Sequence, residues 1–216
     1  MSPSTLRAVG LGLDLGGRCV LDGIDVTVRS GEPLAVSGPS GSGKTVLLLA
    51  LAGLLPATRG AVLMDDEPIP TDDPTWRAAV GVILQNQGLV PELTAEENVA
   101  LPLRERRLGL SELATRSSEA LSAVGLATLG DRLAGEMSGG QRQRVGVARA
   151  LAGGPHILMA DEPTAELDPD NRSLILGLLL ASSPPRIVVV ASNDPEVTDA
   201  CARVVHLRDG RLDDRR

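Results

Sequence analysis

The chain has 216 residues, 43% of them hydrophobic, and a formal net charge of −7 at pH 7. This length suits one substantial α/β domain with a small subdomain, but it is short for two full domains. The acidic balance argues against a general nucleic-acid-binding protein, because such a protein needs a basic surface to displace counterions.

The first third of the chain alternates short apolar runs with turns. Residues 1–17 have neither the charged nor the apolar region of a signal peptide, so none is expected. Residues 20–28 have the period-two pattern of a strand, which ends at a turn over residues 30–33. Further strands are expected at residues 33–37, 61–64 and 80–84.

A glycine-rich segment directly after residues 33–37 matches the phosphate-binding loop pattern G-x-x-x-x-G-K-[ST]. Its glycines let successive backbone N–H groups turn inward around polyphosphate oxygens, and a helix expected at residues 46–52 points its N-terminus at the same place. Lys44 adds a positive charge for the outer phosphates, and the hydroxyl of Thr45 suits Mg²⁺. The expected phosphate-binding residues are Gly38, Pro39, Ser40, Gly41, Ser42, Gly43, Lys44 and Thr45.

The alternative interpretation of this segment is a Gly/Ser-rich surface turn that contains a lysine by chance. Lys44 is the only lysine in the chain, and arginine occupies every other Lys-or-Arg position. A chain that uses arginine elsewhere has kept the compact, flexible ammonium group at one place, which favours the phosphate site.

From residue 93 to residue 154 the sequence becomes helical and charged. A capping-box pattern at residues 94–97 begins a helix that Pro102 is expected to end. Two more helices are expected at residues 111–124 and 141–152, each followed by glycine.

The last third returns to apolar strands, at residues 157–160 and 187–191, with a helix at residues 171–180 between them. The sequence contains no internal repeat. This order of elements predicts a P-loop nucleotide-binding core into which a helical subdomain is inserted.

Composition sets further limits. The longest apolar run, residues 46–55, is about half of the roughly 20 residues that a membrane span needs, so a soluble chain is expected. Cys19 and Cys201 lack the spacing of a metal site or a disulfide framework, which fits a reduced, cytosolic setting. The chain contains neither Phe nor Tyr, so its core is expected to consist of Leu, Val, Ile, Ala and Met.

Two neighbouring carboxylates, Asp161 and Glu162, follow the strand at residues 157–160. A buried parallel strand brings its C-terminal end to the sheet edge where the phosphate loop lies. Asp161 is then placed to hold the water shell of Mg²⁺, and Glu162 to polarise an attacking water. Without the phosphate loop, the sequence Asp-Glu-Pro would indicate only a strand end and a turn.

A third segment, Met137-Ser138-Gly139-Gly140-Gln141, lies between these two. Ser138 suits a helix N-cap, and the glycines bare the backbone at the positive end of the helix, which favours an anion. With this segment the chain resembles the nucleotide-binding subunit of ATP-binding cassette (ABC) transporters, whose signature is usually Leu-Ser-Gly-Gly-Gln. Met137 is an apolar replacement of similar volume. Residues 93–99 look most similar to the stand-alone ATPases of the lipoprotein-release and macrolide-export group.

The resemblance covers essentially the whole chain and implies an α/β P-loop NTPase fold, with a RecA-like core, an antiparallel β subdomain and an inserted helical subdomain. It implies one ABC ATPase domain, residues 1–216, with the nucleotide-binding core at 1–86 and 156–216 and the helical signature subdomain at 87–155. Such a subunit hydrolyses ATP with Mg²⁺ as a head-to-tail homodimer or heterodimer. It lies on the cytoplasmic face of the cell membrane, contacts the membrane only through a transmembrane permease, and drives substrate translocation.

The resemblance also assigns roles to single positions. Gln85 matches the Q-loop glutamine that contacts Mg²⁺ and the attacking water; the alternative is an ordinary polar residue leaving a strand. Asp168 matches the D-loop aspartate at the dimer interface. Residues 87–103 include the surface that receives a coupling helix from the membrane partner. The signature residues, which close over ATP bound to the second subunit, are Ser138, Gly139, Gly140 and Gln141.

Two positions depart from the family pattern. Asn193 stands where the family usually has a histidine that touches the γ-phosphate; asparagine donates a hydrogen bond but is shorter and cannot become cationic. Loss of a transition-state donor costs on the order of 10²–10³ in rate. Slow hydrolysis with retained ATP binding is therefore one expectation, and adequate replacement by Asn193 is the other.

The second departure is the missing aromatic side chain that stacks on adenine. Leu15 occupies about its place, and Arg18 is near enough to lay a guanidinium group over the base. Stacking of a base on an aromatic ring is worth roughly 1–3 kcal/mol in nucleic-acid complexes. The sequence therefore predicts weaker affinity and a looser choice between ATP and GTP.

Two other functions remain open. In the first, ATP closes the dimer to signal to a membrane protein without transport, and Asn193 keeps hydrolysis slow. In the second, a soluble ABC ATPase acts on DNA or ribosomes. The acidic charge, the single cassette and the lack of a long coiled-coil insertion count against the second function.

Overall fold

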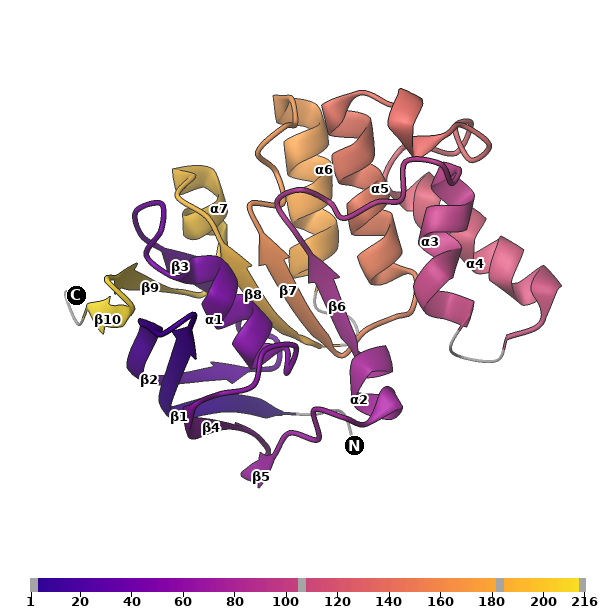
Figure 1. Cartoon of the computed structure of the whole chain (residues 1–216). Helices are drawn as coiled ribbons and strands as arrows, with labels where there is room; N and C mark the ends of the chain where they lie inside the picture. Colours follow the sequence, from indigo (N-terminus) through magenta and orange to yellow (C-terminus); the bar gives the residue numbers. More distant parts are fainter. Residues whose placement is uncertain (1–3, 105–107, 182–184, 214–216) are drawn as a thin grey trace.

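The computed structural model describes residues 4–104, 108–181 and 185–213, which form two sheets and a set of helices (Figure 1). The strands are β1 (Thr5–Leu15), β2 (Arg18–Arg29), β3 (Leu34–Ser37), β4 (Arg59–Met64), β5 (Glu67–Pro68), β6 (Val80–Ile83), β7 (Ile157–Asp161), β8 (Ile187–Ala191), β9 (Arg203–Arg208) and β10 (Arg211–Asp213). The helices are α1 (Lys44–Leu51), α2 (Pro74–Ala79), α3 (Ala95–Arg104), α4 (Leu110–Ala123), the 3-10 turn η1 (Ala134–Glu136), α5 (Gly139–Leu151), α6 (Pro169–Leu180) and α7 (Pro195–Ala200).

The larger sheet positions the candidate site. Its strand order is β10-β9-β3-β8-β7-β6, and every pairing except that of β10 with β9 is parallel. Because β3, β6, β7 and β8 run in the same direction, their C-terminal ends lie at one edge of the sheet. The segments that begin at Gly38, Leu84, Glu162 and Ser192 all leave the sheet at this edge, where open α/β sheets bind ligands.

The smaller sheet is antiparallel, with the order β2-β1-β4-β5, which confirms the expected antiparallel subdomain. Its strand β1 was not expected from the sequence. Gly10 lies in the left-handed region (φ 54°) at a break in the register between Ala8 and Leu11. A bulge of this kind interrupts the alternation of apolar and polar residues on which the recognition of strands depends.

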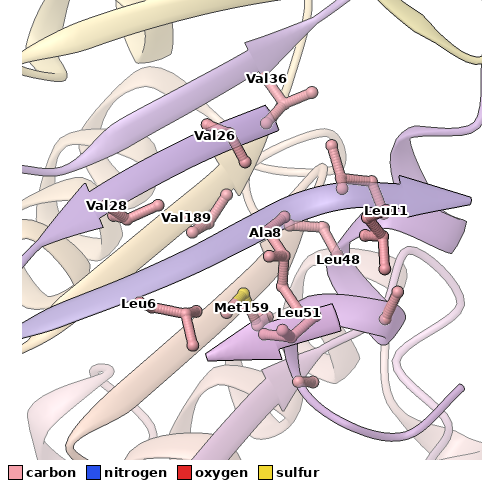
Figure 2. Close-up of a cluster of buried hydrophobic side chains, with 14 of the residues drawn as sticks. Leu6, Ala8, Leu11, Val26, Val28, Val36, Leu48, Leu51, Met159 and Val189 are labelled. Carbon is pink, nitrogen blue, oxygen red and sulfur yellow. The ribbon is translucent and has the colours of Figure 1, made fainter. Parts of the chain in front are cut away.

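The core is aliphatic, as the composition predicted, with Trp76 as its one aromatic member. One cluster fills the space between the antiparallel sheet, α1 and one face of the parallel sheet, where Leu6, Leu48 and Met159 meet (Figure 2). A second cluster joins the opposite face of the parallel sheet to α3, α4, α5 and α6. Alternate residues of β7 divide between them: Met159 belongs to the first and Leu158 to the second, as the period of a strand requires.

The expectation that Pro102 ends a helix is wrong, because α3 continues through it to Arg104. Proline near the end of a helix leaves only the bond to the carbonyl of Asn98 unmade. The fully buried side chain of Leu103 is one residue further on, and its packing outweighs that loss. The start of the same helix is as expected: the N–H of Glu97 donates to Thr94 Oγ1 at 3.1 Å, and the N–H of Thr94 donates to Glu97 Oε2 at 2.8 Å.

The structure bears on two expectations from composition, one about membrane-spanning helices and one about the two cysteines. Among the described residues, no helix combines the length and the apolar character that a membrane crossing requires. Cys19 and Cys201 are both free thiols, and burial raises the pKa of Cys201 to about 11. The thiol of Cys201 is therefore neutral at pH 7.

Candidate functional site

The phosphate loop joins β3 to α1, and its conformation depends on glycine. Gly41 (φ 80°) and Gly43 (φ 105°) occupy the left-handed region that other residues rarely adopt. A Cβ atom on Gly38 would come within 2.0 Å of the carbonyl oxygen of Leu207, so no side chain fits there. Gly43 caps α1 without a side-chain hydrogen bond, and the first turn of α1 contains no acidic residue. The N–H groups and positive end of α1 therefore stay available to an anion.

One side chain of the loop fits a polyphosphate. Lys44 Nζ donates to its own loop, at 2.6 Å to the carbonyl oxygen of Gly38 and at 3.3 Å to that of Pro39. The ammonium group is thus held directly over the loop. Ser42 Oγ is buried and has no hydrogen-bond partner among the described residues, but Ser42 does not line the pocket that the loop borders.

The loop forms one wall of a pocket of about 450 Å³. A wider opening of about 800 Å³ lies between β2, β9 and β10, but none of the expected site residues line it. Chemistry rather than size therefore identifies the candidate site. The lining residues of the smaller pocket are Val20, Ser40, Gly41, Gly43, Lys44, Thr45, Val46, Gln85, Asp161, Glu162, Ala165 and Asn193.

The oxygen atoms needed for Mg²⁺ meet in this pocket. Thr45 Oγ1 donates to Asp161 Oδ2 at 2.5 Å, although 116 positions separate them in the sequence. Asp161 is only 3% exposed, and Gln85 lines the same pocket. Mg²⁺ prefers oxygen ligands and is usually bound by one or two carboxylates together with phosphate and water. A hydroxyl, a carboxylate and an amide oxygen at one place fit that donor set.

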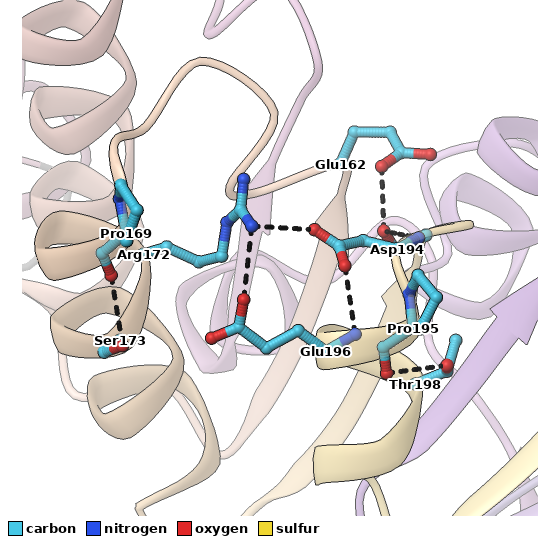
Figure 3. Close-up of polar contacts among 9 residues, drawn as sticks. Glu162, Pro169, Arg172, Ser173, Asp194, Pro195, Glu196 and Thr198 are labelled. Carbon is cyan, nitrogen blue, oxygen red and sulfur yellow. Dashed lines mark hydrogen bonds and ion pairs between the residues drawn. The ribbon is translucent and has the colours of Figure 1, made fainter.

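Glu162 directly follows β7 and has a left-handed backbone (φ 46°). Its N–H donates to the carbonyl oxygen of Ala191 at 2.9 Å, and its carboxylate Oε2 accepts a hydrogen bond from Ser192 Oγ at 2.9 Å. Both partners come from β8 and the residue after it. The neighbouring strand therefore fixes the backbone and the side chain of Glu162 together, and Figure 3 shows the hydrogen bond to the carboxylate.

Asn193 connects the end of β8 to the phosphate loop. Its Oδ1 accepts the N–H of Gly38 at 2.9 Å. Because the oxygen of the amide is engaged in this way, the Nδ2 group is the end that remains to donate to a ligand. The structure thus places a neutral donor beside the loop, at the position where the family pattern usually has a histidine.

A polar network around Asp194 follows Asn193 along the chain (Figure 3). The N–H of Asp194 donates to Ser192 Oγ at 3.1 Å, and the Asp194 carboxylate accepts the N–H of Glu196, which caps α7. Arg172 of α6 forms ion pairs with Asp194 at 3.4 Å and Glu196 at 3.2 Å. Helix α6 is therefore tied to the segment that holds Glu162.

Leu15 and Arg18 do not line the pocket. They face each other across the β1–β2 turn, and both are exposed; Leu15 is 43% accessible. Val20, two residues after Arg18, does line the pocket. The role of the two residues beside a nucleotide base stays a prediction.

The signature residues lie outside the pocket of their own chain, at the N-terminus of α5. Ser138 and Gln141 form a capping box, with the N–H of Gln141 donating to Ser138 Oγ at 3.3 Å and the N–H of Ser138 donating to Gln141 Oε1 at 3.0 Å. The first turn of α5 carries no acidic residue. A Cβ atom on Gly140 would lie 2.9 Å from the carbonyl oxygen of Glu166, so this turn packs against Glu166 and Leu167.

Asp168 is the N-cap of α6, with its carboxylate accepting the N–H of Asn171 at 2.9 Å and Asn171 Nδ2 at 2.7 Å. The hydrogen bond from the backbone of Asn171, followed by that from its side chain, lowers the pKa of Asp168. The structure thus shows a local role for Asp168 at the start of α6, and its contact with a second subunit stays a prediction.

The sequence interpretation gave no site role to Val20, Val46, Ala165 and Ser192. The first three are apolar residues at the pocket wall, and Ser192 is a fully buried serine at the end of a strand. Ala165 begins the segment that resembles the D-loop, but only Asp168 of that segment was expected at a site. Only the pairing of β7 with β8 brings Ser192 to Glu162.

Comparison with known proteins extends these observations. A family model described as "ABC transporter" matches residues 21–165. The lipoprotein-releasing system ATP-binding protein LolD of Psychrobacter arcticus is 39% identical over 199 residues, which cover 88% of this chain and 88% of LolD. The pyoverdine export ATP-binding/permease protein PvdT of Pseudomonas fluorescens is 37% identical, but the match covers 89% of this chain and only 30% of PvdT.

A solved structure shows the same fold. The ATP-binding cassette MJ0796, determined as a dimer in a post-hydrolysis state with ADP and Pi bound, superposes with a TM-score of 0.89. It is 32% identical in sequence, and the match covers 96% of each chain.

Proposed function

The chain belongs to the ABC transporter family, and from this premise we propose that it binds and hydrolyses ATP as a head-to-tail dimer and thereby powers transport through a membrane-embedded partner. One observation carries the proposal. The hydrogen-bonded pair Thr45–Asp161 lies in the same pocket as Lys44, Glu162 and the bare N-terminus of α1. These are the groups that phosphoryl transfer to water requires.

Each group has a part in the reaction. The N–H groups of the loop and the ammonium of Lys44 bind the phosphates, while Thr45 and Asp161, with Gln85, are the residues that hold Mg²⁺. The metal supplies charge neutralisation at the phosphates when bound. Glu162, held by Ser192, orients the attacking water and accepts its proton. The Nδ2 group of Asn193 donates a hydrogen bond to the terminal phosphate.

The dimer is inferred from the place of the signature residues. Ser138 and Gly139 lie at the positive end of α5, away from the pocket of their own chain. A second copy, or a related ATPase, arranged head to tail presents its phosphates to that end. The dimeric structure of MJ0796 with ADP and Pi supports a dimer of this kind of chain.

We assign the docking site of the membrane partner to a groove of about 470 Å³. It lies between the end of α2, β6, α3 and α5, with Arg77, Leu101, Pro102 and Arg149 among its lining residues. We divide the chain here into a nucleotide-binding core, residues 1–86 and 156–216, and a helical subdomain, residues 87–155. A transmembrane partner docked in this groove places the chain on the cytoplasmic face of the membrane. The names of LolD and PvdT, which include lipoprotein release and export, support a transport role.

The test is steady-state ATP hydrolysis by the chain reconstituted with its co-purifying membrane protein. We expect phosphate release that depends on Mg²⁺ and that Glu162→Gln reduces by about 10²-fold or more, because a general base contributes 10²–10⁴. ATP binding by Glu162→Gln is the control and stays intact. Hydrolysis that Glu162→Gln leaves unchanged contradicts the proposed role of Glu162.

A second function is favoured by Asn193, whose Oδ1 is engaged by Gly38 and which cannot become cationic. In this case ATP closes the dimer, hydrolysis is slow, and the chain regulates a membrane protein. Near-zero turnover by the wild type with ATP-dependent binding to the membrane partner supports this second function over transport.

A further inference from the structure

Gln143 is a buried glutamine on α5, five positions after Ser138 and only 1% exposed. Its Nε2 donates to the carbonyl oxygen of Pro163 at 2.8 Å and, at 3.4 Å, to that of Glu162. Its Oε1 accepts a hydrogen bond from Gln87 Nε2 at 2.7 Å. One side chain therefore joins the peptide that follows β7 to the loop that follows β6.

Gln87 completes the connection on the side of Gln85. It is 7% exposed, has a left-handed backbone (φ 52°), and its Nε2 also donates to the carbonyl oxygen of Gln85 at 3.2 Å. The Gln87–Gln143 pair thus contacts the backbone of both candidate catalytic residues, Gln85 and Glu162.

The surface of α5 is shaped to receive this loop. Gly146, one turn after Gln143, faces the same loop, since a Cβ atom there would lie in van der Waals contact with Gln87, at 3.4 Å from its Cβ. Arg149, nearly one turn further, donates to the carbonyl oxygens of Gln87 and, at 2.7 Å, of Gly88. Gln143 and Arg149, on one face of the helix, therefore hold Gln87 and Gly88 directly, and Gln87 in turn holds Gln85.

The strands by themselves do not fix Gln85 relative to Glu162. Glu162 follows Asp161, which pairs with Ala191 of β8, but the last paired residue of β6 is Ile83, so Gln85 lies two positions beyond the ladder. The position of Gln85 therefore depends on loop contacts. A buried amide network whose members are all hydrogen-bonded is rigid, and leaving one member unpaired is costly.

We propose that Gln143, acting through Gln87, is a positioning residue that sets Gln85 and Glu162 relative to each other and makes both follow the movement of α5. The inference rests on the proposed function, because it takes Gln85 and Glu162 as groups that act on ATP. Helix α5 carries Ser138 at its N-terminus. A phosphate that binds there in the dimer therefore also affects the positions of Gln85 and Glu162, through the Gln87–Gln143 pair.

The first test is the kinetics of Gln87→Met, Gln143→Met and the double variant, in which methionine keeps the volume and removes the amide. We expect kcat to fall by about 10- to 100-fold in each single variant, since small misplacements of catalytic groups have effects of this size, while KM for ATP changes little. The double variant loses no more than the larger single loss, because the pair acts as a unit. Unchanged kcat, or losses that multiply, overturns the inference.

The matched control is Val145→Ala, which removes packing from the buried face of the same helix without touching the pair. Its melting temperature falls, and its kcat, measured well below that temperature, stays near that of the wild type. If Val145→Ala lowers kcat as much as Gln143→Met, the kinetic losses reflect stability alone and the inference fails.

Amide hydrogen exchange tests the pair without ATP hydrolysis. In the wild type without nucleotide we expect protection across residues 85–88, and in Gln143→Met an exchange about tenfold faster there, with Val145→Ala unchanged at these residues. If the wild type neither binds nor hydrolyses ATP, the proposed function fails while this measurement still decides whether the pair holds the loop. Equal exchange at residues 85–88 in the wild type and Gln143→Met shows that the Gln87–Gln143 pair does not hold the loop, and the inference fails.

Discussion

The side chain of Asn193 spans the space between the end of β8 and the phosphate loop. Its oxygen is engaged by the N–H of Gly38, which leaves its Nδ2 group as a neutral donor. We expect Asn193→His to raise the steady-state rate of ATP hydrolysis by about tenfold or more, because a full transition-state donor is worth on the order of 10²–10³. Phosphate release at saturating Mg-ATP measures this.

Asn193→Ala serves as the control for that change. It removes both the donor and the contact with Gly38, so hydrolysis falls below that of the wild type while the binding of ATP weakens only slightly. An ordinary wild-type rate that Asn193→His leaves unchanged shows instead that asparagine replaces the histidine fully.

The turn between β1 and β2 carries no aromatic ring for a nucleotide base. Leu15 is exposed there, opposite Arg18, and Val20, further along β2, lines the pocket. We expect ATP and GTP to compete about equally for the wild type. Leu15→Tyr tightens ATP binding by roughly 5- to 150-fold, which corresponds to the 1–3 kcal/mol of base stacking. Equilibrium binding of both nucleotides measures this, and a strong ATP preference in the wild type refutes it.

At the scale of elements, the start of α6 depends on a charged cap. The cap is Asp168, whose carboxylate accepts hydrogen bonds from Asn171. These hydrogen bonds lower the pKa of Asp168 below the ordinary value of 3.8. A group whose pKa is lower in the folded state contributes stability that is present above its unfolded pKa and lost as pH falls through its folded pKa. The contribution of Asp168 is therefore complete near pH 5 and disappears at lower pH.

Urea unfolding of the wild type and Asp168→Asn between pH 7 and pH 2.5 tests this cap. Asparagine is an equally good N-cap but does not titrate. We expect the stability advantage of the wild type over Asp168→Asn to shrink only below about pH 4, where the carboxylate becomes protonated. A difference that is constant across this range shows that the charge of Asp168 contributes nothing.

For the whole molecule, the position of Ser138 outside its own pocket predicts ATP-dependent assembly. Ser138→Asp and Ser138→Asn both keep the cap of α5, but only aspartate adds a negative charge where the phosphates of a second subunit would bind. In the Glu162→Gln background with ATP, we expect Ser138→Asn to elute as a dimer and Ser138→Asp as a monomer in size-exclusion chromatography. Equal dimerisation of the two variants contradicts the head-to-tail arrangement.

Elements with a strong local signal were predicted well from the sequence. The strands at β3, β7 and β8 are short apolar runs, and α4 and α5 begin and end near the expected residues. Two differences have identifiable reasons: the bulge at Gly10 hides the pattern of β1, and the burial of Leu103 carries α3 past Pro102. In β1 the bulge interrupts the local pattern itself, whereas in α3 a tertiary contact outweighs the preference of the local sequence.

The sequence by itself determined the phosphate loop, the Asp161–Glu162 pair and the family resemblance, because their chemistry depends on particular residue types at fixed spacing. Only the tertiary structure decided which residues serve these groups. Ser192 reaches Glu162 through strand pairing, and Gln143 reaches Gln87 across 56 positions. Serine and glutamine carry no distinctive local pattern, so their roles follow from where parallel strands and α5 bring them, which depends on burial of the whole core.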